Sequence, residues 1–253
     1  MTLENNTKKC FIFRFYAELN DFLPEHRKQK SFVEYFKTPI TLNDVLVSLG
    51  IPFSEVDLVL VNGISVQMNH KLKENDRIAV YPKFESLDIT SVTNLREKPL
   101  RDTKFILDCH LGKLAKYLRM LGFDSFYQNQ IGDEEIIEIA AKEGRVILTR
   151  DKLLLKSIKI THGYFVRAIT KHEQLKEVVR KFDLYKQFES FTRCMSCNEK
   201  LKTIDKASII GRIGPDIARI FNQFYHCPNC DKIYWKGSHF KRMEGFIREL
   251  VKE

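Results

Sequence analysis

Two short cysteine pairs in the last quarter of the chain have the spacing of a metal site. Cys194 and Cys197 are separated by two residues, as are Cys227 and Cys230, and 29 residues lie between the pairs. Each pair can present two thiolates from a tight turn, and four thiolates in tetrahedral geometry suit zinc and leave no open position for water. We therefore predict a structural zinc ion bound by these four cysteines.

Two other chemistries remain open for the cysteine pairs. A single pair of this spacing can act as a redox dithiol, and four cysteines can also bind an iron–sulfur cluster. Two pairs of the same form in one basic segment favour zinc over both. The other cysteines, Cys10 and Cys109, lie in apolar, strand-like runs. No secretory signal or apolar run of 18 residues is present, so we expect reduced thiols in a cytoplasmic setting.

Acidic residues in the middle of the chain are a second candidate for chemistry. Asp108 and Asp151 stand at or just past the ends of the apolar runs FIL and RVILT, and Asp133 and Glu134 open a helical pattern between them. In an open parallel sheet, residues beyond the carboxyl ends of the strands face one crevice. Carboxylates gathered there would bind magnesium or manganese, and such an ion can activate water for attack on a phosphodiester.

Each acid also has a simpler explanation. Asp133 and Glu134 suit the positive end of a helix, and Asp133 or Asp151 could serve as an N-cap. Asp108 is harder to explain by packing, because it follows a buried run and precedes an apolar helix. From the residues alone, capping and metal binding both stay open.

Basic residues accompany the acids. Lys113, Lys116 and Arg119 belong to the helical run that follows the first acid, and Arg150 directly precedes the last one. Any of them could contact phosphates. Lys113 and Arg150 are the closest to the expected crevice. A solvated helix face is the simpler explanation for Lys116 and Arg119.

The segment after the second cysteine pair mixes aromatic and basic residues, among them Trp235, Lys236 and His239. Aromatic side chains interleaved with bases can stack on unpaired nucleotides and bind phosphates. The same residues could instead pack a small zinc module and keep it in solution. Both roles stay open.

Positive charge is concentrated in the second part of the chain. Residues 1–103 contain 14 Lys and Arg against 14 Asp and Glu, whereas residues 104–253 contain 28 against 19. A basic balance of this kind favours a polyanionic partner, of which nucleic acid is the commonest.

Residues 1–82 are expected to form a small α+β domain. KKCFIFRF alternates as a half-buried strand does, and TLNDVLVSLG predicts a helix with Thr41 as N-cap and Gly50 as its end. VDLVLVNGISV contains the turn dipeptide Asn62-Gly63, and DRIAVYP predicts a closing strand.

The segment from Pro39 to Pro82 resembles the β-grasp fold of ubiquitin-like sulfur carriers. Those carriers end in a Gly-Gly pair, which is absent here because the chain continues through YPKFES. The resemblance therefore implies a docking or substrate-positioning role, with a protein partner, rather than sulfur transfer.

The rest of the chain divides into a linker and two further parts. Residues 83–103 are polar and lack periodicity, as a linker does. From residue 104 strand-like and helical runs alternate, which predicts an α/β domain with a parallel sheet over residues 104–185. Residues 186–253 would then form the zinc module.

The run FILDCHLGKLAKYLRMLGFD, followed by DEEIIEIAAKEG and RVILTRD, resembles the Mut-seven carboxy-terminal RNase family, a branch of the PIN-like nucleases. The resemblance covers roughly residues 104–245 and includes both cysteine pairs. It implies an α/β/α sandwich with a C-terminal zinc ribbon, in which clustered acids bind a divalent metal ion and cleave single-stranded RNA. By position, Asp108, Asp133 or its neighbour Glu134, and Asp151 match the acids of the family.

These observations predict an endoribonuclease that depends on magnesium or manganese, with RNA as its partner and no membrane association. Many PIN nucleases have a fourth acid, for which the GYFVRAI region offers no candidate. This gap favours the alternative of an RNA-binding adaptor that keeps the nuclease fold but does not cleave.

Overall fold

The computed structural model describes residues 8–82, 103–157, 159–160 and 162–252. The chain forms two compact units, one made of Met1–Asp102 and Ile131–Phe165 and the other of Thr103–Gln130 and Val166–Glu253. The expected linker lies outside the described residues, apart from Thr103. Within the described ranges, no helix has the length and apolar character needed to cross a membrane.

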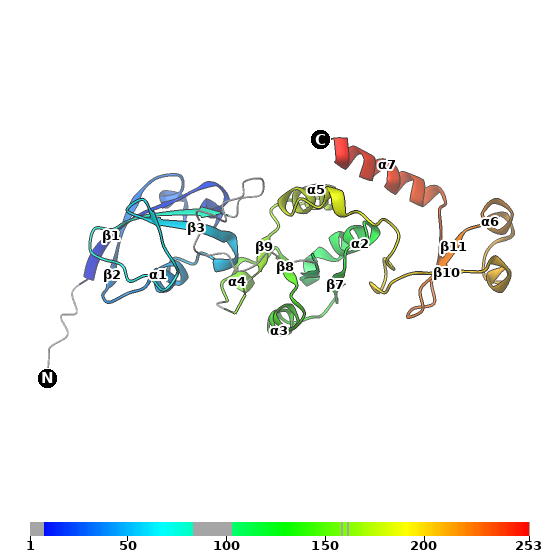
Figure 1. Ribbon diagram of the computed structural model, residues 1–253, viewed down its shortest axis with the longest axis horizontal. Helices are drawn as coiled ribbons and strands as arrows, with labels where there is room; N and C mark the ends of the chain where they lie inside the picture. Colours follow the sequence, from blue (N-terminus) through cyan, green and yellow to red (C-terminus); the bar gives the residue numbers. More distant parts are fainter. Residues whose placement is uncertain (1–7, 83–102, 158, 161, 253) are drawn as a thin grey trace. The chain divides into compact units, whose positions relative to one another are not determined.

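The N-terminal domain, residues 8–82, is a five-stranded sheet with one α-helix (Figure 1). The strand order is β2-β1-β5-β3-β4; β1 and β5 are parallel, and the other neighbouring pairs are antiparallel. This mixed sheet with one helix is the arrangement expected of a β-grasp fold. The elements are β1 (Lys8–Phe15), β2 (Phe32–Lys37), α1 (Leu42–Ser48), β3 (Val56–Val61), β4 (Ile64–Ser65), β5 (Arg77–Pro82) and the 3-10 helices η1 (Ala17–Phe22), η2 (Glu25–Arg27) and η3 (Phe53–Glu55).

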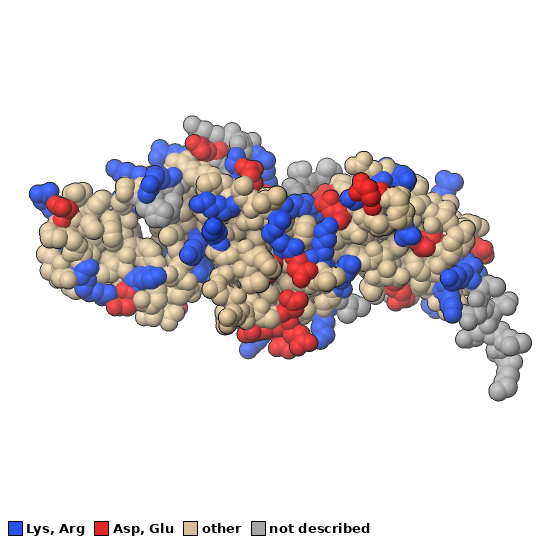
Figure 2. Space-filling view, turned by 180° about the vertical axis from the view of Figure 1, so that it is seen from behind, with Lys and Arg blue, Asp and Glu red and all other residues tan. Residues whose placement is uncertain are grey.

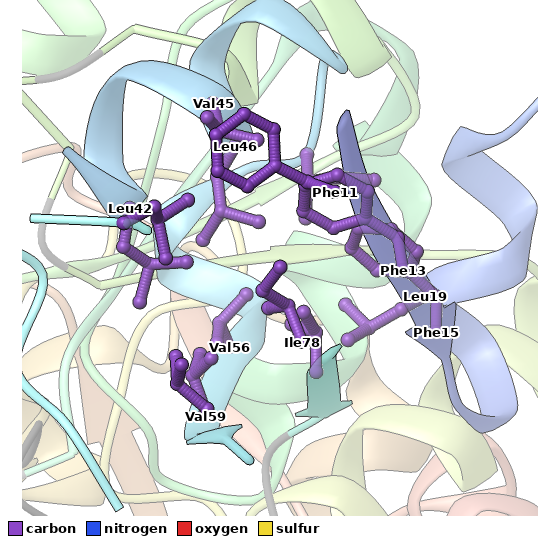
Figure 3. Packing of buried hydrophobic residues seen from close by; sticks show 14 of the residues in the cluster. Phe11, Phe13, Phe15, Leu19, Leu42, Val45, Leu46, Val56, Val59 and Ile78 are labelled. Carbon is purple, nitrogen blue, oxygen red and sulfur yellow. The ribbon is translucent and has the colours of Figure 1, made fainter. Parts of the chain in front are cut away.

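Alternation and helical spacing in the sequence account for the core of this domain. Phe11, Phe13 and Phe15 point to one face of β1 and are almost fully buried, while α1 contributes side chains at helical spacing, Leu42 and Val45 among them. Figure 3 shows these residues packed together between the helix and the strands.

Turn chemistry fixes the ends of these elements as expected. Thr41 forms a capping box with Asp44 at the start of α1, and Gly50 adopts a left-handed conformation just after the helix. Asn62 and Gly63 both have positive φ angles, 52° and 84°, as a tight hairpin between β3 and β4 requires.

The first unit also contains α3 (Asp133–Glu143), β8 (Val146–Thr149), α4 (Lys152–Leu155) and β9 (Gly163–Phe165). β8 and β9 pair in parallel, and α3 packs on β8 through its buried face. The expected strand over GYFVRAI is shorter than predicted, because only its first three residues pair.

The second unit begins with β6 (Phe105–Leu107), the 3-10 helix η4 (Cys109–Leu111), α2 (Gly112–Met120) and β7 (Ser125–Tyr127), and β6 and β7 pair in parallel. α5 (Lys171–Lys181) packs on α2. The parallel sheet has the strand order β7-β6-β8-β9, so the α/β class predicted from alternating strands and helices is confirmed.

The C-terminal module, residues 186–252, has a three-stranded antiparallel sheet of order β10-β11-β12. Its strands are only three residues long. The described elements are β10 (Lys202–Ile204), the 3-10 helix η6 (Lys206–Ile209), α6 (Pro215–Ile220), β11 (Phe224–His226), β12 (Ile233–Trp235) and α7 (Ser238–Lys252); the 3-10 helix η5 (Tyr185–Gln187) leads into them.

Phe13 provides a test of the N-terminal core. Its ring is fully buried and lies 5.9 Å from the ring of Phe32. We expect Phe13→Ala to lower the free energy of unfolding of this domain by about 3–5 kcal/mol, because the variant loses apolar burial and leaves a cavity. Urea denaturation monitored by circular dichroism measures the change. Val33→Ala, on the exposed face of β2, should change it by less than about 0.5 kcal/mol; equal effects would contradict the packing described.

Candidate metal centre and acidic residues

The four cysteines of the C-terminal module come together in one cluster. Their sulfur atoms all lie within 4.8 Å of one another. The Sγ atoms of Cys194 and Cys230 are 3.5 Å apart, and those of Cys197 and Cys227 are 3.3 Å apart. Tetrahedral zinc with ordinary zinc–sulfur bonds would hold its sulfur ligands about 3.8 Å apart. The cluster therefore fits a tetrahedral metal ion after small shifts of the side chains.

The two cysteine pairs are built in the same way. In each pair the backbone N–H of the first cysteine donates back to a carbonyl just past the turn, at 2.8 Å for Cys194 and 2.9 Å for Cys227. The residue after the second cysteine, Asn198 or Asp231, has a positive φ angle and donates its N–H to the first cysteine's carbonyl. Both turns therefore aim their two thiols at one point.

The thiols differ in how readily they lose a proton. Burial raises the pKa of Cys197, but a hydrogen bond from the backbone N–H of Glu199 and contacts with neighbouring thiols lower that pKa to about 6. Burial raises the pKa of Cys230 to about 12. A divalent ion would replace the protons that such crowded thiols retain, so metal binding here is coupled to proton release.

Arg119 joins the first cysteine turn to the α/β part of the same unit. Its side chain is 3% exposed, and its guanidinium donates to the carbonyls of Ser125 and Ser196 at 2.8 and 2.9 Å. Burial lowers the pKa of Arg119, and the nearby cysteine sulfurs oppose that effect. The expectation of a solvated side chain is wrong for Arg119, because the backbone of the turn satisfies its charge.

Asp108 is the most buried of the predicted catalytic acids. It directly follows β6, is 4% exposed, and accepts a hydrogen bond from the backbone N–H of His110 at 2.8 Å, which makes it the N-cap of η4. Cys109, next to it, is exposed and lies in that 3-10 helix rather than in a strand.

The other predicted acids lie at helix starts in the first unit. Asp151 is the N-cap of α4 and accepts from the backbone N–H of Leu153 at 2.7 Å, as the capping explanation predicted. Gly132 is the N-cap of α3, so the N-cap role considered for Asp133 is wrong; Asp133 and Glu134 are exposed residues of the first helical turn. Figure 2 shows acidic side chains gathered over α3.

The basic and aromatic residues predicted to contact RNA have varied surroundings. Lys113 is exposed on α2, and Arg150 is half-buried. Trp235 is half-buried and packs against Phe224, with 6.5 Å between ring centroids, so it contributes to packing in the module. Lys236 is exposed with its ammonium 5.3 Å from a neighbouring ring. The side chain of His239 lies outside the described residues.

Sequence reasoning missed one acid beside the region searched for a fourth carboxylate. The carboxylate of Glu177, on α5, accepts hydrogen bonds from the backbone N–H groups of Arg167 and Ala168 at 2.9 and 2.8 Å. These residues follow β9, so Glu177 also takes up backbone donors that a longer strand would have paired. The only signal in the sequence was an acid between buried positions of a helix, Leu175 and Val178.

Comparison with family models covers most of the chain. The model described as the Mut7-C RNAse domain matches residues 103–247, and the model described as Mut7-C ubiquitin matches residues 8–88. Searches of curated proteins and of solved structures found no match. Because the RNase model alone matches more than half of the chain, and the cysteine cluster lies within that match, the chain belongs to the Mut7-C RNase family, with the ubiquitin-like domain of that family preceding its RNase domain.

Proposed function

We propose that this protein is a divalent-metal-dependent endoribonuclease that cleaves single-stranded RNA at a carboxylate site made by Asp108, Asp133 and Asp151, with Glu134 as the substitute for Asp133. Membership of the RNase family supports the nuclease class. The observation that carries the site is the burial of Asp108 at the carboxyl end of β6. A carboxylate at the carboxyl end of a parallel strand stands where ligands of such sheets bind, and its oxygens are of the kind that magnesium and manganese prefer.

Local hydrogen bonds restrain two of the proposed acids. In Asp108 and Asp151 one carboxylate oxygen accepts from a backbone N–H two residues ahead, which restricts the side chain without neutralising it. Both residues follow strands of the same parallel sheet. A magnesium or manganese ion held by these oxygens would polarise the phosphodiester and activate the attacking water.

We propose that RNA contacts come from Lys113, Arg150 and Lys236, with Trp235 as a stacking surface. The excess of Lys and Arg over Asp and Glu in the second part of the chain supports a polyanionic substrate. Arg119 is left out, because backbone carbonyls already occupy its guanidinium. The unpaired cysteines support a reducing, cytoplasmic setting.

One observation favours a second candidate, an RNA-binding adaptor without cleavage. Residues 166–170, which follow β9, contain no acid, and the carboxylate of Glu177 is engaged by the backbone there. A salt-dependent gel shift of RNA without cleavage in magnesium or manganese would identify the adaptor.

Asp108 is the sharpest test of the nuclease. Asp108→Asn keeps the side-chain oxygen that caps η4 but removes the charge that a metal ion requires. We expect manganese-dependent cleavage of a single-stranded RNA to fall more than about a hundredfold with an unchanged melting temperature. Asp205→Asn, at the matching cap of η6, is the control and should cleave like the wild type. Undiminished cleavage by Asp108→Asn would remove the residue from the site.

We further propose that the ion in the cysteine cluster is structural zinc. Mass spectrometry of the native protein should find about one equivalent of zinc, because four thiolates complete its coordination. Cys197→Ser should lose this zinc and melt at a lower temperature, whereas Cys10→Ser, in β1, should retain it. Iron in the native protein, or full zinc occupancy in Cys197→Ser, would refute the assignment.

A further inference from the structure

The ubiquitin-like domain contacts a segment of the RNase domain that is more than 100 residues away in the chain. Glu55, in η3, is 2% exposed, and its carboxylate accepts a hydrogen bond from the backbone N–H of Phe165, in β9, at 2.5 Å. Among the described strands, β9 stands at the edge of its sheet. Glu55 therefore satisfies a donor at a sheet edge.

Lys152, the first residue of α4, forms the second contact. Its ammonium donates to the carbonyl of Asp21, in the ubiquitin-like domain, at 2.5 Å. The same ammonium lies 5.6 Å from the ring of Phe22 and 5.2 Å from the ring of Phe165, and these two rings meet edge to face at 6.0 Å. One cation thus joins aromatic residues of both partners.

Close packing of side chains against Gly163, the first residue of β9, completes this interface. A Cβ on Gly163 would lie 2.7 Å from the Cδ2 atom of Leu155 and 3.1 Å from the hydroxyl of Ser54, so a larger residue there would force these side chains to shift. Ser54 is itself 1% exposed. The contact is therefore packed, and α4 and β9 are held against η3 and the end of η1.

The contact bears directly on one of the proposed catalytic acids. Asp151 precedes Lys152 in the chain and caps α4 through the backbone N–H of Leu153. α4 is only four residues long, too short to persist without tertiary support. The orientation of α4, and with it the direction of the Asp151 carboxylate, depends on the contacts of the helix with β8, with β9 and with the ubiquitin-like domain.

We propose that the ubiquitin-like domain is a positioning element of the RNase site, and that Lys152 and Phe22 are the positioning residues through which it orients Asp151. Glu55 supports the same segment from β9. This inference rests on the proposed role of Asp151 in metal binding. It assigns the N-terminal domain a part in catalysis that requires no contact with substrate.

The first test measures the helix itself, independently of cleavage. Lys152→Met keeps the apolar stem and removes the ammonium, and Phe22→Leu removes the ring from the other side. In the full chain, hydrogen–deuterium exchange of peptides covering residues 150–157 should become about tenfold faster in both variants. Lys28→Met is the matched control, because it breaks a lysine–glutamate hydrogen bond elsewhere in the same domain. Wild-type exchange in both variants would overturn the proposal.

The second test separates positioning from a merely structural role. We expect Lys152→Met to lower kcat for RNA cleavage about tenfold, to leave KM within about twofold, and to need more manganese for half-maximal rate, because Asp151 is misaligned rather than lost. Lys152→Arg, which restores a cation, should recover most of the rate. Faster exchange with unchanged kcat and manganese requirement would refute the link to Asp151. A wild-type protein that binds RNA without cleaving it would refute the proposed function, while the exchange result would still decide whether the domain holds α4.

Discussion

The convergence of four cysteine side chains is the interaction on which the C-terminal module depends. Among the described residues of this module, the buried apolar side chains are Cys194, Ile209, Phe224 and Cys227, which is too few for an independent core. Its strands are three residues long, and a sheet of such strands has little stability of its own. The ubiquitin-like domain, by contrast, has a continuous apolar core.

The α/β part of the chain also has short helices and strands. In each unit, a buried or half-buried cation helps to hold them in place. In the second unit, Arg119 donates to the carbonyl of Ser125, the first residue of β7, and to a carbonyl of the first cysteine turn. In the first unit, Lys152 donates to Asp21 and lies between two aromatic rings. Both cations are held by backbone carbonyls, which are neutral and fixed in place by the fold. Arg119, which was considered as a phosphate contact, thus has a structural role instead.

Much of the fold follows from local pattern, and the exceptions have physical reasons. Alternation predicted β1, helical spacing predicted α1 and α2, and the Asn-Gly dipeptide predicted the hairpin after β3. β2 was not predicted, because FVEYFK has apolar residues on both faces and two of its three exposed positions are the apolar Val33 and Tyr35. The strand β9 was predicted too long, because the carboxylate of Glu177 takes the N–H groups that would have continued it.

The candidate sites divide in the same way, into features that local sequence patterns predict and features that depend on residues distant in the chain. The cysteine pairs could be recognised from spacing, because each pair of ligands comes from one local turn and four thiols together are a typical ligand set for zinc. Local signals also placed Asp108 and Asp151 at element boundaries, where a cap and a metal ligand have the same residue preferences. The hydrogen bond of Lys152 to Asp21 spans 131 residues of sequence, and that of Glu55 to Phe165 spans 110. Periodicity carries no information over such a separation. A carboxylate that already caps a helix needs only a fixed helix to become a well-oriented ligand, so the residues that hold α4 matter to the proposed site as much as the acid does.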